Sequence, residues 1–258
     1  MPSANAVRTK GPAATSGAAA AISFRRLNFV MPKLYIRHGL KKTATLSSSV
    51  QDYLKELYKL QAGGRASTSA LAGRMEVAPA SATAMLKKLA GLGLVEHEPY
   101  RGARLTPAGE RIAIEMIRHH RLLEQYLSKT LGLSIDAVHA EADRLEHALS
   151  EELEAAIDES LGFPTHDPHG DPIPSAALEL DHPEHRTLAD LEPGKSARIE
   201  RVPDSDPALL RYLDELGLVP GARVRLSAAA PFDGPVTIAS RGGEHAISRE
   251  LAARIAVD

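Results

Sequence analysis

The chain has 258 residues, of which 43% are hydrophobic and 25% are charged, and it has no cysteine. This composition is typical of a folded protein with a sizeable core, and it excludes disulfides, thiolate catalysis and thiolate-bound zinc. No stretch reaches the roughly 18 to 20 apolar residues that a membrane helix needs. We therefore expect a cytoplasmic protein of two or three domains without a membrane partner, in which oxygen and imidazole hold any metal.

The net charge of −2 hides a segregation of charge along the chain. Residues 1–45 carry eight basic residues and no acid, and residues 46–108 carry eight basic residues and five acids. Residues 109–182 carry five basic residues and sixteen acids, while residues 183–258 carry ten and twelve. A basic first part indicates a polyanionic partner, and an acidic middle indicates cations.

The first half of the chain predicts a DNA-binding domain behind a basic arm. Residues 1–45 are rich in Ala, Ser, Gly, Lys and Arg without periodicity, so we expect them to be disordered. From Leu46 the spacing of Val50, Leu54 and Leu57 predicts a helix that ends at Gly63-Gly64. Two further helices and two strands follow, which is the order of a winged helix-turn-helix domain over residues 46–108.

The second half predicts a helical domain and a small β domain. "TPAGE" restarts a helix, and residues 107 to about 161 have the pattern of two helices separated by "LGLSID", long enough to pack as a hairpin or across a dimer axis. The stretch "GFPTHDPHGDPIPS" then ends the helical domain of residues 109–182. Short alternating runs with one helical insert predict a β-barrel over residues 183–258.

Histidines and acids lie on or beside the apolar faces of both central helices. At about 100° per residue, His120 and Glu124 lie inside the apolar face of the first helix. The second helix contains "HAEADRLEH", and His139, Asp143, Glu146 and His147 of this stretch form an arc that borders its apolar face. On that second helix, Glu141 and Arg144 point outward and are expected to be solvated. A buried acid without a basic residue on its arc needs a cation.

Pairing of the two helices predicts two metal pockets. Imidazole with several carboxylates suits Mn(II), Fe(II), Co(II) or Zn(II). A di-metal carboxylate enzyme would use similar ligands, but it would also need a repeated Glu-x-x-His and a further general acid or base, which we do not find. A repressor with a small organic effector would leave Glu124 unexplained. One pocket would use His120, Glu124 and His139, and the other Asp143, Glu146 and His147.

The third predicted helix, within "ASATAMLKKL", carries the candidates for DNA contact. Small side chains allow a helix to approach base edges, and nearby Lys and wing Arg side chains can reach phosphates. Ala and Lys are also simply good helix formers. The candidates are Ala78, Ala80, Ser81, Thr83, Ala84, Lys87, Lys88, Arg101 and Arg104.

The segments "RHHRLLEQYL", "GLSIDAVHAEADRLEHALSEEL" and "DPHGDPIP" resemble the diphtheria toxin repressor family, from about Leu46 to the C-terminus. The resemblance implies a homodimeric, Mn(II)-dependent repressor of metal-uptake genes that binds operator DNA without an organic cofactor and is not an enzyme. An Fe(II)-dependent repressor is the alternative. The resemblance assigns His120, Glu124 and His139 to one metal site, and it assigns Asp52, Asp143, Glu146 and His147 to the other.

Three positions bear on which metal is bound. Asp143 and Asp52 stand where iron-type members have Cys and Met, and harder oxygen ligands favour Mn(II), with Co(II) or Zn(II) as surrogates. Helical geometry alone places Asp52 roughly opposite the buried face, where it would be a solvated acid. Lys55 stands where manganese-type members can supply a Glu ligand, so a merged site around His120, Glu124 and His139 is expected in place of their paired site.

The C-terminal domain resembles the SH3-like, ferrous-transport-type domain, on "LLRYLDELGLVPGARVRL" and "PFDGPVTI". In iron-type relatives this domain can lend side chains to the first metal site, which makes Asp204 and Asp206 further candidate ligands. The remaining histidines of this region are expected in linker structure or solvent; they are His166, His169, His182 and His185.

Overall fold

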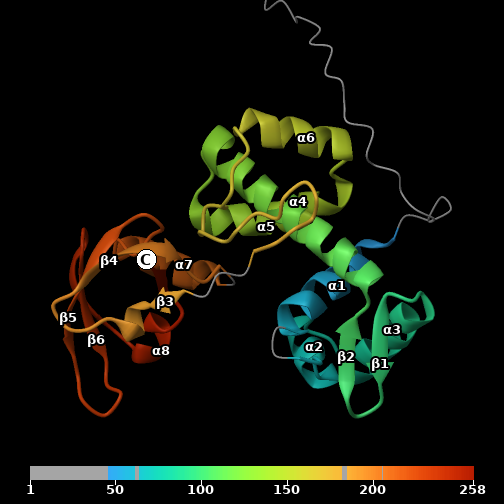
Figure 1. Cartoon of the computed structure of the whole chain (residues 1–258), viewed down its shortest axis with the longest axis horizontal. Coiled ribbons are helices and arrows are strands. Elements are labelled where there is room, and N and C mark those ends of the chain that lie inside the picture. The colour runs from blue at the N-terminus through green and yellow to red at the C-terminus, as the bar shows by residue number, and fades with distance from the viewer. Residues whose placement is uncertain (1–45, 62–63, 182–184, 205) are drawn as a thin grey trace, which may run out of the picture. The chain divides into compact units, whose positions relative to one another are not determined.

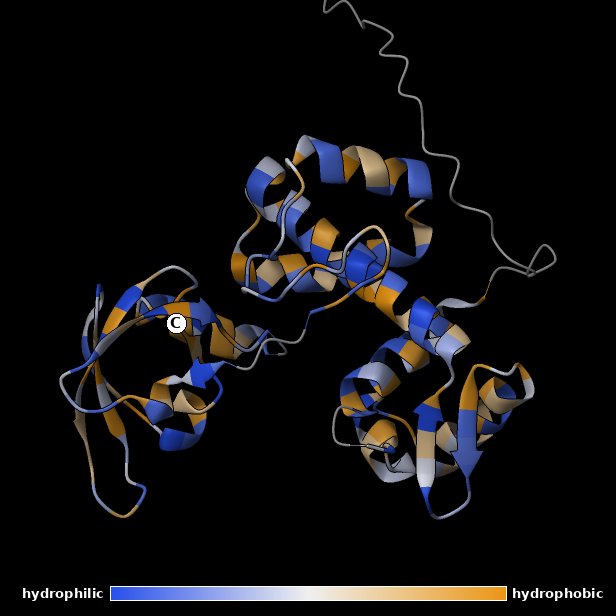
Figure 2. Cartoon of the chain, viewed as in Figure 1, coloured by the Kyte–Doolittle hydropathy of each residue, from blue (hydrophilic) through white to orange (hydrophobic). Residues whose placement is uncertain are grey.

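The computed structural model describes residues 46–61, 64–181, 185–204 and 206–258 (Figure 1). The predicted disordered arm, Gly63 and His182 lie outside these ranges. Buried side chains of the described residues gather in three hydrophobic cores, and Figure 2 shows apolar and polar residues alternating along the helices around them. No helix in the described ranges is long and apolar enough to cross a membrane.

The first core belongs to a winged helix-turn-helix domain, as the sequence predicted. Val50, Leu54 and Leu57 are buried on one face of the first helix, and Ser67 caps the second by accepting a hydrogen bond from the backbone N–H of Ala70 at 3.0 Å. The two strands pair antiparallel as a wing. The elements are α1 (Ser48–Leu60), α2 (Thr68–Arg74), α3 (Pro79–Gly91), β1 (Val95–Glu98) and β2 (Gly102–Leu105).

Helix α4 (Pro107–Leu131) is shared by two cores. Thr106 caps it by accepting a hydrogen bond from the backbone N–H of Gly109 at 3.2 Å. Ala113 near its start belongs to the core of the winged domain, whereas Leu122 and Leu127 belong to the core of the helical domain. The two domains are therefore joined by one continuous helix.

The second central helix is shorter than the sequence predicted. The chain forms α5 (Ile135–Leu145), a 3₁₀ turn η2 (Glu146–Ala148) and then α6 (Glu151–Ser160), where we expected one helix to about residue 161. Ser150 starts α6 by accepting a hydrogen bond from the backbone N–H of Leu153 at 3.2 Å, so a local cap interrupts the apolar periodicity. As a result Leu153, which one uninterrupted helix would place on the apolar face, is 52% exposed.

The loop between α6 and the C-terminal domain packs closely on its neighbours. The side-chain amide of Gln125 in α4 donates a hydrogen bond to the backbone oxygen of His166 at 2.9 Å. Gly170 has a φ of +91°, and a Cβ there would lie 1.9 Å from the backbone oxygen of Glu200. The loop "DPHGD" is thus held by the hydrogen bond from Gln125 to the residue before it and by the close packing of Gly170 on the backbone of Glu200.

The third core lies within the C-terminal domain, where an antiparallel sheet has the strand order β3-β8-β4-β5-β6-β7. The predicted helical insert is α7, whose N-cap residue is Asp206. Alternate residues of β4, such as Ala197 and Ile199, are buried, as the period-two pattern predicted. The elements are β3 (Arg186–Thr187), η3 (Leu188–Asp190), β4 (Ser196–Arg201), α7 (Pro207–Glu215), β5 (Arg223–Ala229), β6 (Val236–Ser240), β7 (Gly243–Ile247), α8 (Arg249–Ala252) and β8 (Ala256–Val257).

The first turn of α4 passes so close to the wing that Gly109 has no room for a side chain. A Cβ there would lie 2.1 Å from the backbone oxygen of Leu94. We expect Gly109→Ala to lower the free energy of unfolding by about 1–3 kcal/mol, as overpacking does. Gly91→Ala is the matched control, because nothing lies within 4 Å of its added Cβ. Urea unfolding followed by circular dichroism measures both, and equal stability of the two variants would contradict the close packing.

Candidate metal centre

Two histidines and one glutamate meet between α4 and α5. His120 and Glu124 lie one turn apart on α4, and His139 faces them from α5. One oxygen of Glu124, Oε1, lies 3.1 Å from His120 Nε2 and 3.0 Å from His139 Nδ1. His120 Nε2 is itself 3.0 Å from His139 Nδ1. The three side chains of the first predicted pocket are therefore brought together.

A second group forms where α1 meets the turn η2. His147 Nε2 lies 3.0 Å from Asp52 Oδ1, and its Nδ1 lies 2.8 Å from the side-chain oxygen of Gln51. One ligand atom each of Asp52, Glu146 and His147 can be chosen so that all lie within 4.8 Å of one another. Asp52 is therefore not the solvated acid that helical geometry alone predicted, because η2 folds over that face of α1.

The two groups are connected, which the two-pocket prediction did not foresee. His120 Nδ1 lies 2.7 Å from Glu146 Oε2 and 3.2 Å from Asp143 Oδ1. Asp143 was expected with Glu146 and His147, but its ligand atom lies within 4.8 Å of those of His120 and His139. On the same helix, Glu141 and Arg144 pair with each other on the surface, as expected.

Lys55 joins the same cluster from α1. Its ammonium lies 2.9 Å from Asp143 Oδ1 and 2.6 Å from Glu146 Oε1, and the residue is only 6% exposed. Burial lowers the pKa of Lys55, but these two carboxylates outweigh burial and raise it above its ordinary value. The sequence prediction counted basic residues on the arcs of α4 and α5 alone and therefore missed this cation.

Neighbouring side chains shift the pKa values of Glu124 and His120 in opposite directions. Burial raises the pKa of the Glu124 carboxyl, but hydrogen bonds from His120 and His139 outweigh burial and hold it well below its usual range. Burial lowers the pKa of His120, but Asp143, Glu124 and Glu146 raise it well above its ordinary value. A proton on His120 thus supplies positive charge that a metal ion would replace, with release of that proton.

The loop "DPHGD" adds two residues that the sequence prediction missed. His169, expected in linker structure or solvent, is fully buried, and its Nε2 lies 3.4 Å from Glu124 Oε1. Asp167 is buried beside it, and its Oδ1 accepts hydrogen bonds of 2.9 Å from the backbone N–H groups of His169 and Asp171. The repeated acids and histidines of "HDPHGD" were the available signal. By contrast, His166 is exposed, and His185 pairs with Glu200 at 2.9 Å.

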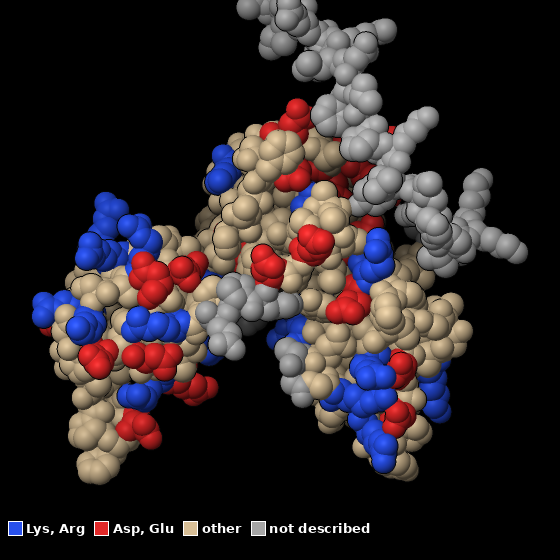
Figure 3. Space-filling view, viewed as in Figure 1, with Lys and Arg blue, Asp and Glu red and all other residues tan. Residues whose placement is uncertain are grey.

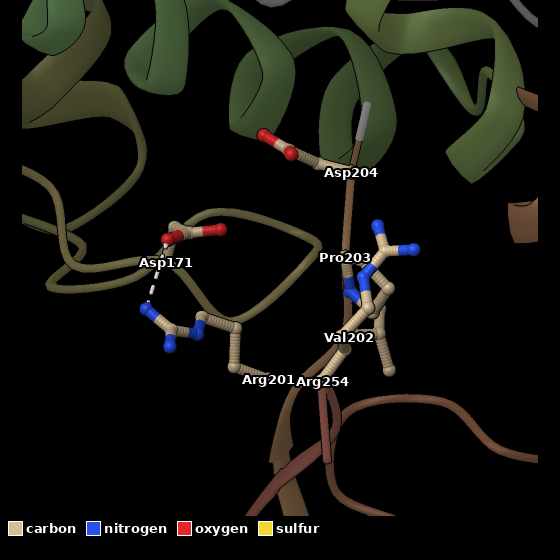
Figure 4. A pocket seen from close by; sticks show the side chains of 6 residues that line it. All are labelled: Asp171, Arg201, Val202, Pro203, Asp204 and Arg254. Carbon is tan, nitrogen blue, oxygen red and sulfur yellow. Dashed lines mark hydrogen bonds and ion pairs between the residues drawn. The ribbon is translucent and has the colours of Figure 1, made fainter. Parts of the chain in front are cut away.

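The two candidate ligands from the C-terminal domain have different surroundings. Asp206 caps α7, since its Oδ1 accepts hydrogen bonds from the backbone N–H groups of Ala208 at 2.8 Å and Leu209 at 3.3 Å. The structure does not bring Asp206 to the centre. Asp204 lies at a pocket that Arg254 also lines and that extends to Asp171 (Figure 4).

The charge of Asp204 reaches His169. Burial lowers the pKa of His169, but Glu124, Asp167 and Asp204 together raise it above its ordinary value. Of the two candidate ligands from the C-terminal domain, Asp204 is the one whose charge acts on His169, beside Glu124.

All DNA-contact candidates of the winged domain except Thr83 are exposed, and Figure 3 shows Lys and Arg over this domain together with some Asp and Glu. Thr83 is partly buried, and its hydroxyl donates to the backbone oxygen of Pro79 at 2.8 Å. The wing arginines are paired with acids of β1: Arg104 lies 2.7 Å from Glu96 and Arg101 lies 3.5 Å from Glu98. The exposed candidates on or beside α3 are Ala78, Ala80, Ser81, Ala84, Lys87 and Lys88.

Unpaired polar atoms show that these residues fit a divalent ion. Among the described residues, Glu124 Oε2, Asp167 Oδ2 and both ring nitrogens of His169 are buried without a hydrogen-bond partner. Buried acceptors without a partner are costly, and a coordinated ion would satisfy several at once. Carboxylate oxygens and imidazole nitrogens are the donors that Mn(II) and Fe(II) accept.

Comparison with known families identifies all three domains. The family model "Iron dependent repressor, N-terminal DNA binding domain" matches residues 45–103. The model "Iron dependent repressor, metal binding and dimerisation domain" matches residues 106–175, and "FeoA domain" matches residues 186–258. Fold and site together define a metal-dependent transcriptional regulator.

Individual relatives agree with this class. The diphtheria toxin repressor of Corynebacterium efficiens is 31% identical over 222 residues, which are 83% of this chain and 96% of that protein. The iron-dependent repressor IdeR of Mycobacterium tuberculosis is 31% identical over 229 residues, which are 83% of this chain and 98% of that protein. A solved manganese-dependent transcriptional repressor in complex with manganese is 39% identical, with a TM-score of 0.73 over 81% of this chain and 98% of that one.

The chain therefore belongs to the diphtheria toxin repressor family of metal-dependent transcriptional repressors, which are not enzymes. The family that the sequence motifs predicted is confirmed. The alternative of a di-metal carboxylate enzyme is wrong.

Asp167 gives the metal-free protein a characteristic pH dependence. Burial, reinforced by the charges of Glu124 and Asp171, raises the pKa of its carboxyl from 3.8 to about 8. The folded protein thus binds this proton more tightly than the unfolded chain, so the stabilisation is complete at low pH and is lost as the pH rises toward 8. We expect Asp167→Asn to raise the free energy of unfolding at pH 8 by at least about 1.4 kcal/mol, which corresponds to one pKa unit.

The advantage of Asp167→Asn should shrink as the pH falls toward the ordinary pKa of an aspartate. Chemical unfolding of the metal-free protein at a series of pH values measures this trend. Exposed Asp181→Asn is the control and should leave the pH dependence unchanged. A constant difference between the Asp167 variant and wild type at all pH values would contradict the raised pKa.

Proposed function

We propose that the protein is a Mn(II)-dependent transcriptional repressor that binds operator DNA as a homodimer and controls metal-uptake genes. The observation that carries this proposal is the meeting of Asp52 on α1 with Glu146 and His147 on η2. Helix α1 belongs to the winged domain, whereas η2 belongs to the helical domain. Ligands from both domains allow one ion to fix how the DNA-binding domain is held.

The proposed ligand assignment keeps the two sets that the family resemblance predicted, and Asp143, whose Oδ1 also lies 3.2 Å from His120 Nδ1, stands between them. His120, Glu124 and His139 would hold one ion, joined by His169 of the linker loop and influenced by Asp204. The second ion would be held by Asp52, Asp143, Glu146 and His147. His120 contacts Glu124 of the first set and Glu146 of the second, so an ion bound by one set changes the electrostatic environment of the other.

Mn(II) is proposed over softer ions because the described ligands are oxygen and imidazole, and the chain has no cysteine. The manganese-dependent repressor of similar structure supports this choice. Fe(II) is the alternative, because the same donors accept it and IdeR is named as iron-dependent. Comparing Mn(II), Fe(II), Co(II) and Zn(II) in one DNA-binding titration separates these ions.

Two winged domains held by a dimer would present their α3 helices to two operator half-sites. To shift the protein from 1% to 99% DNA-competent, metal binding must favour that state by about 5.5 kcal/mol. Coordination by residues on α1, α4, α5 and η2 would act on this equilibrium directly, since those elements join the winged domain to the helical one.

Metal control is tested with the variant Glu146→Ala, His147→Ala. The DNA is a duplex selected by the wild-type protein from a random pool in the presence of Mn(II). We expect wild-type binding to appear with micromolar Mn(II) and to vanish with chelator, and we expect the double variant to lose at least about tenfold in affinity, or 1.4 kcal/mol. Fluorescence anisotropy of labelled duplex measures both proteins.

The surface residue Glu141 provides the matched control, since Glu141→Ala changes an acid of the same helix region outside both groups. It should respond to Mn(II) as wild type does. Size-exclusion chromatography with light scattering should show that wild type and variants are dimers. DNA binding by metal-free wild type that equals binding with Mn(II) would contradict metal control.

The DNA-contact residues predict a specific salt dependence. Lys87 and Lys88 are exposed at the end of α3, where they can neutralise phosphates. Each lost phosphate contact reduces the slope of log affinity against log salt by about 1. We expect the double variant Lys87→Ala, Lys88→Ala to lower the slope by about 2, whereas Lys129→Ala, exposed at the far end of α4, leaves it unchanged. Unchanged slopes for all variants would place the DNA elsewhere.

A further inference from the structure

Lys55 holds two carboxylates that the metal centre needs. Its ammonium bridges Asp143 on α5 and Glu146 on η2, at 2.9 and 2.6 Å. Among the lysines of the described ranges, it is the only one that is buried. Its position on α1 is one turn from Gln51 and Asp52, whose side chains contact His147.

Both oxygens of Glu146 are engaged in this arrangement. Oε1 accepts from Lys55 at 2.6 Å, and Oε2 lies 2.7 Å from His120 Nδ1. An ion held by Asp52, Glu146 and His147 therefore has to bind a Glu146 oxygen that already faces a positive charge. Asp143 Oδ1 is in the same position, since it too faces both Lys55 and His120.

Stability alone does not account for a buried lysine here. Bringing an ammonium out of water costs about as much as its attraction to the acids returns, so a buried ion pair is weak evidence of a stabilising role. The acids that Lys55 contacts are proposed ligands, and its flexible four-carbon stem allows the ammonium to move aside. The Lys55 ammonium therefore occupies carboxylate oxygens that a metal ion would bind, and it is attached to the chain beside them.

We propose that Lys55 is a tethered competitor of the metal ion: its ammonium contacts Asp143 and Glu146 in the metal-free protein and raises the metal concentration at which the second ion binds. This inference rests on the proposed function, because it concerns the regulation of the same site. The competitor is part of the chain, so its effective concentration is constant. The threshold of the repressor is then set by a residue that is not itself a ligand.

The test removes the charge and keeps the length of the side chain. Lys55→Met leaves Asp143 and Glu146 without the competing ammonium, and Lys59→Met is the matched control on the same helix. Lys59 pairs with Glu56 at 3.1 Å and contacts neither ligand group. Isothermal titration calorimetry of metal-free protein with MnCl₂, without DNA, should give at least tenfold tighter binding for the Lys55 variant and unchanged binding for the Lys59 variant.

A second measurement separates competition from a merely structural role. Without metal, Lys55→Met should unfold at a lower temperature than wild type, because it leaves the acids uncompensated. With saturating MnCl₂ this difference should disappear or reverse. Lys55→Gln, which keeps a donor but no charge, should shift both readouts in the same direction and serves if the Met variant does not fold.

The outcomes distinguish this inference from the proposed function. If folded Lys55→Met or Lys55→Gln binds Mn(II) as weakly as wild type or more weakly, Lys55 is not a competitor, even when wild-type DNA binding depends on Mn(II). If wild type binds no Mn(II), the proposed function fails and this inference fails with it. Tighter binding by both variants, with the Mn(II) midpoint for DNA binding shifted by the same factor, supports the competitor.

Discussion

Carboxylates buried where α1, α4 and α5 meet require positive charge at the same place. Glu124 and Glu146 have almost no exposed surface, and an uncompensated charge in such a position would be very costly. In the metal-free chain the compensating charge comes from His120 and Lys55, and His139 Nδ1 lies within hydrogen-bond distance of Glu124. The buried acids must therefore be compensated for the winged domain to pack against the helical domain, and the same acids form the site for a cation.

Much of this architecture could be predicted from the sequence because its causes are local. The spacing of Val50, Leu54 and Leu57 defines the buried face of α1, and Thr106 marks the start of α4. His120 and Glu124 are four residues apart on one helix, so their shared face follows from helical geometry alone. The family resemblance added Asp52 and assigned it to one site with His147, which lies 95 positions later in the chain and contacts it in the structure.

The remaining features depend on contacts between distant segments. Lys55 reaches Asp143 and Glu146 across a domain boundary, and no periodicity within α1 distinguishes it from a solvated lysine. His169 is buried because the linker loop folds back onto α4, which a Pro- and Gly-rich sequence does not reveal. The end of α5 was missed for a different reason: the cap at Ser150 acts within a few residues and overrides a longer apolar pattern.

The continuity of α4 constrains the length of the chain more strictly than its composition. Ala113 belongs to the winged core, and His120 lies in the same helix at the metal centre. Because each helical residue turns the chain by about 100°, one residue inserted or deleted between them would rotate the histidine out of register with the wing. The number of residues cannot change, so natural variation should leave this interval free of insertions and deletions.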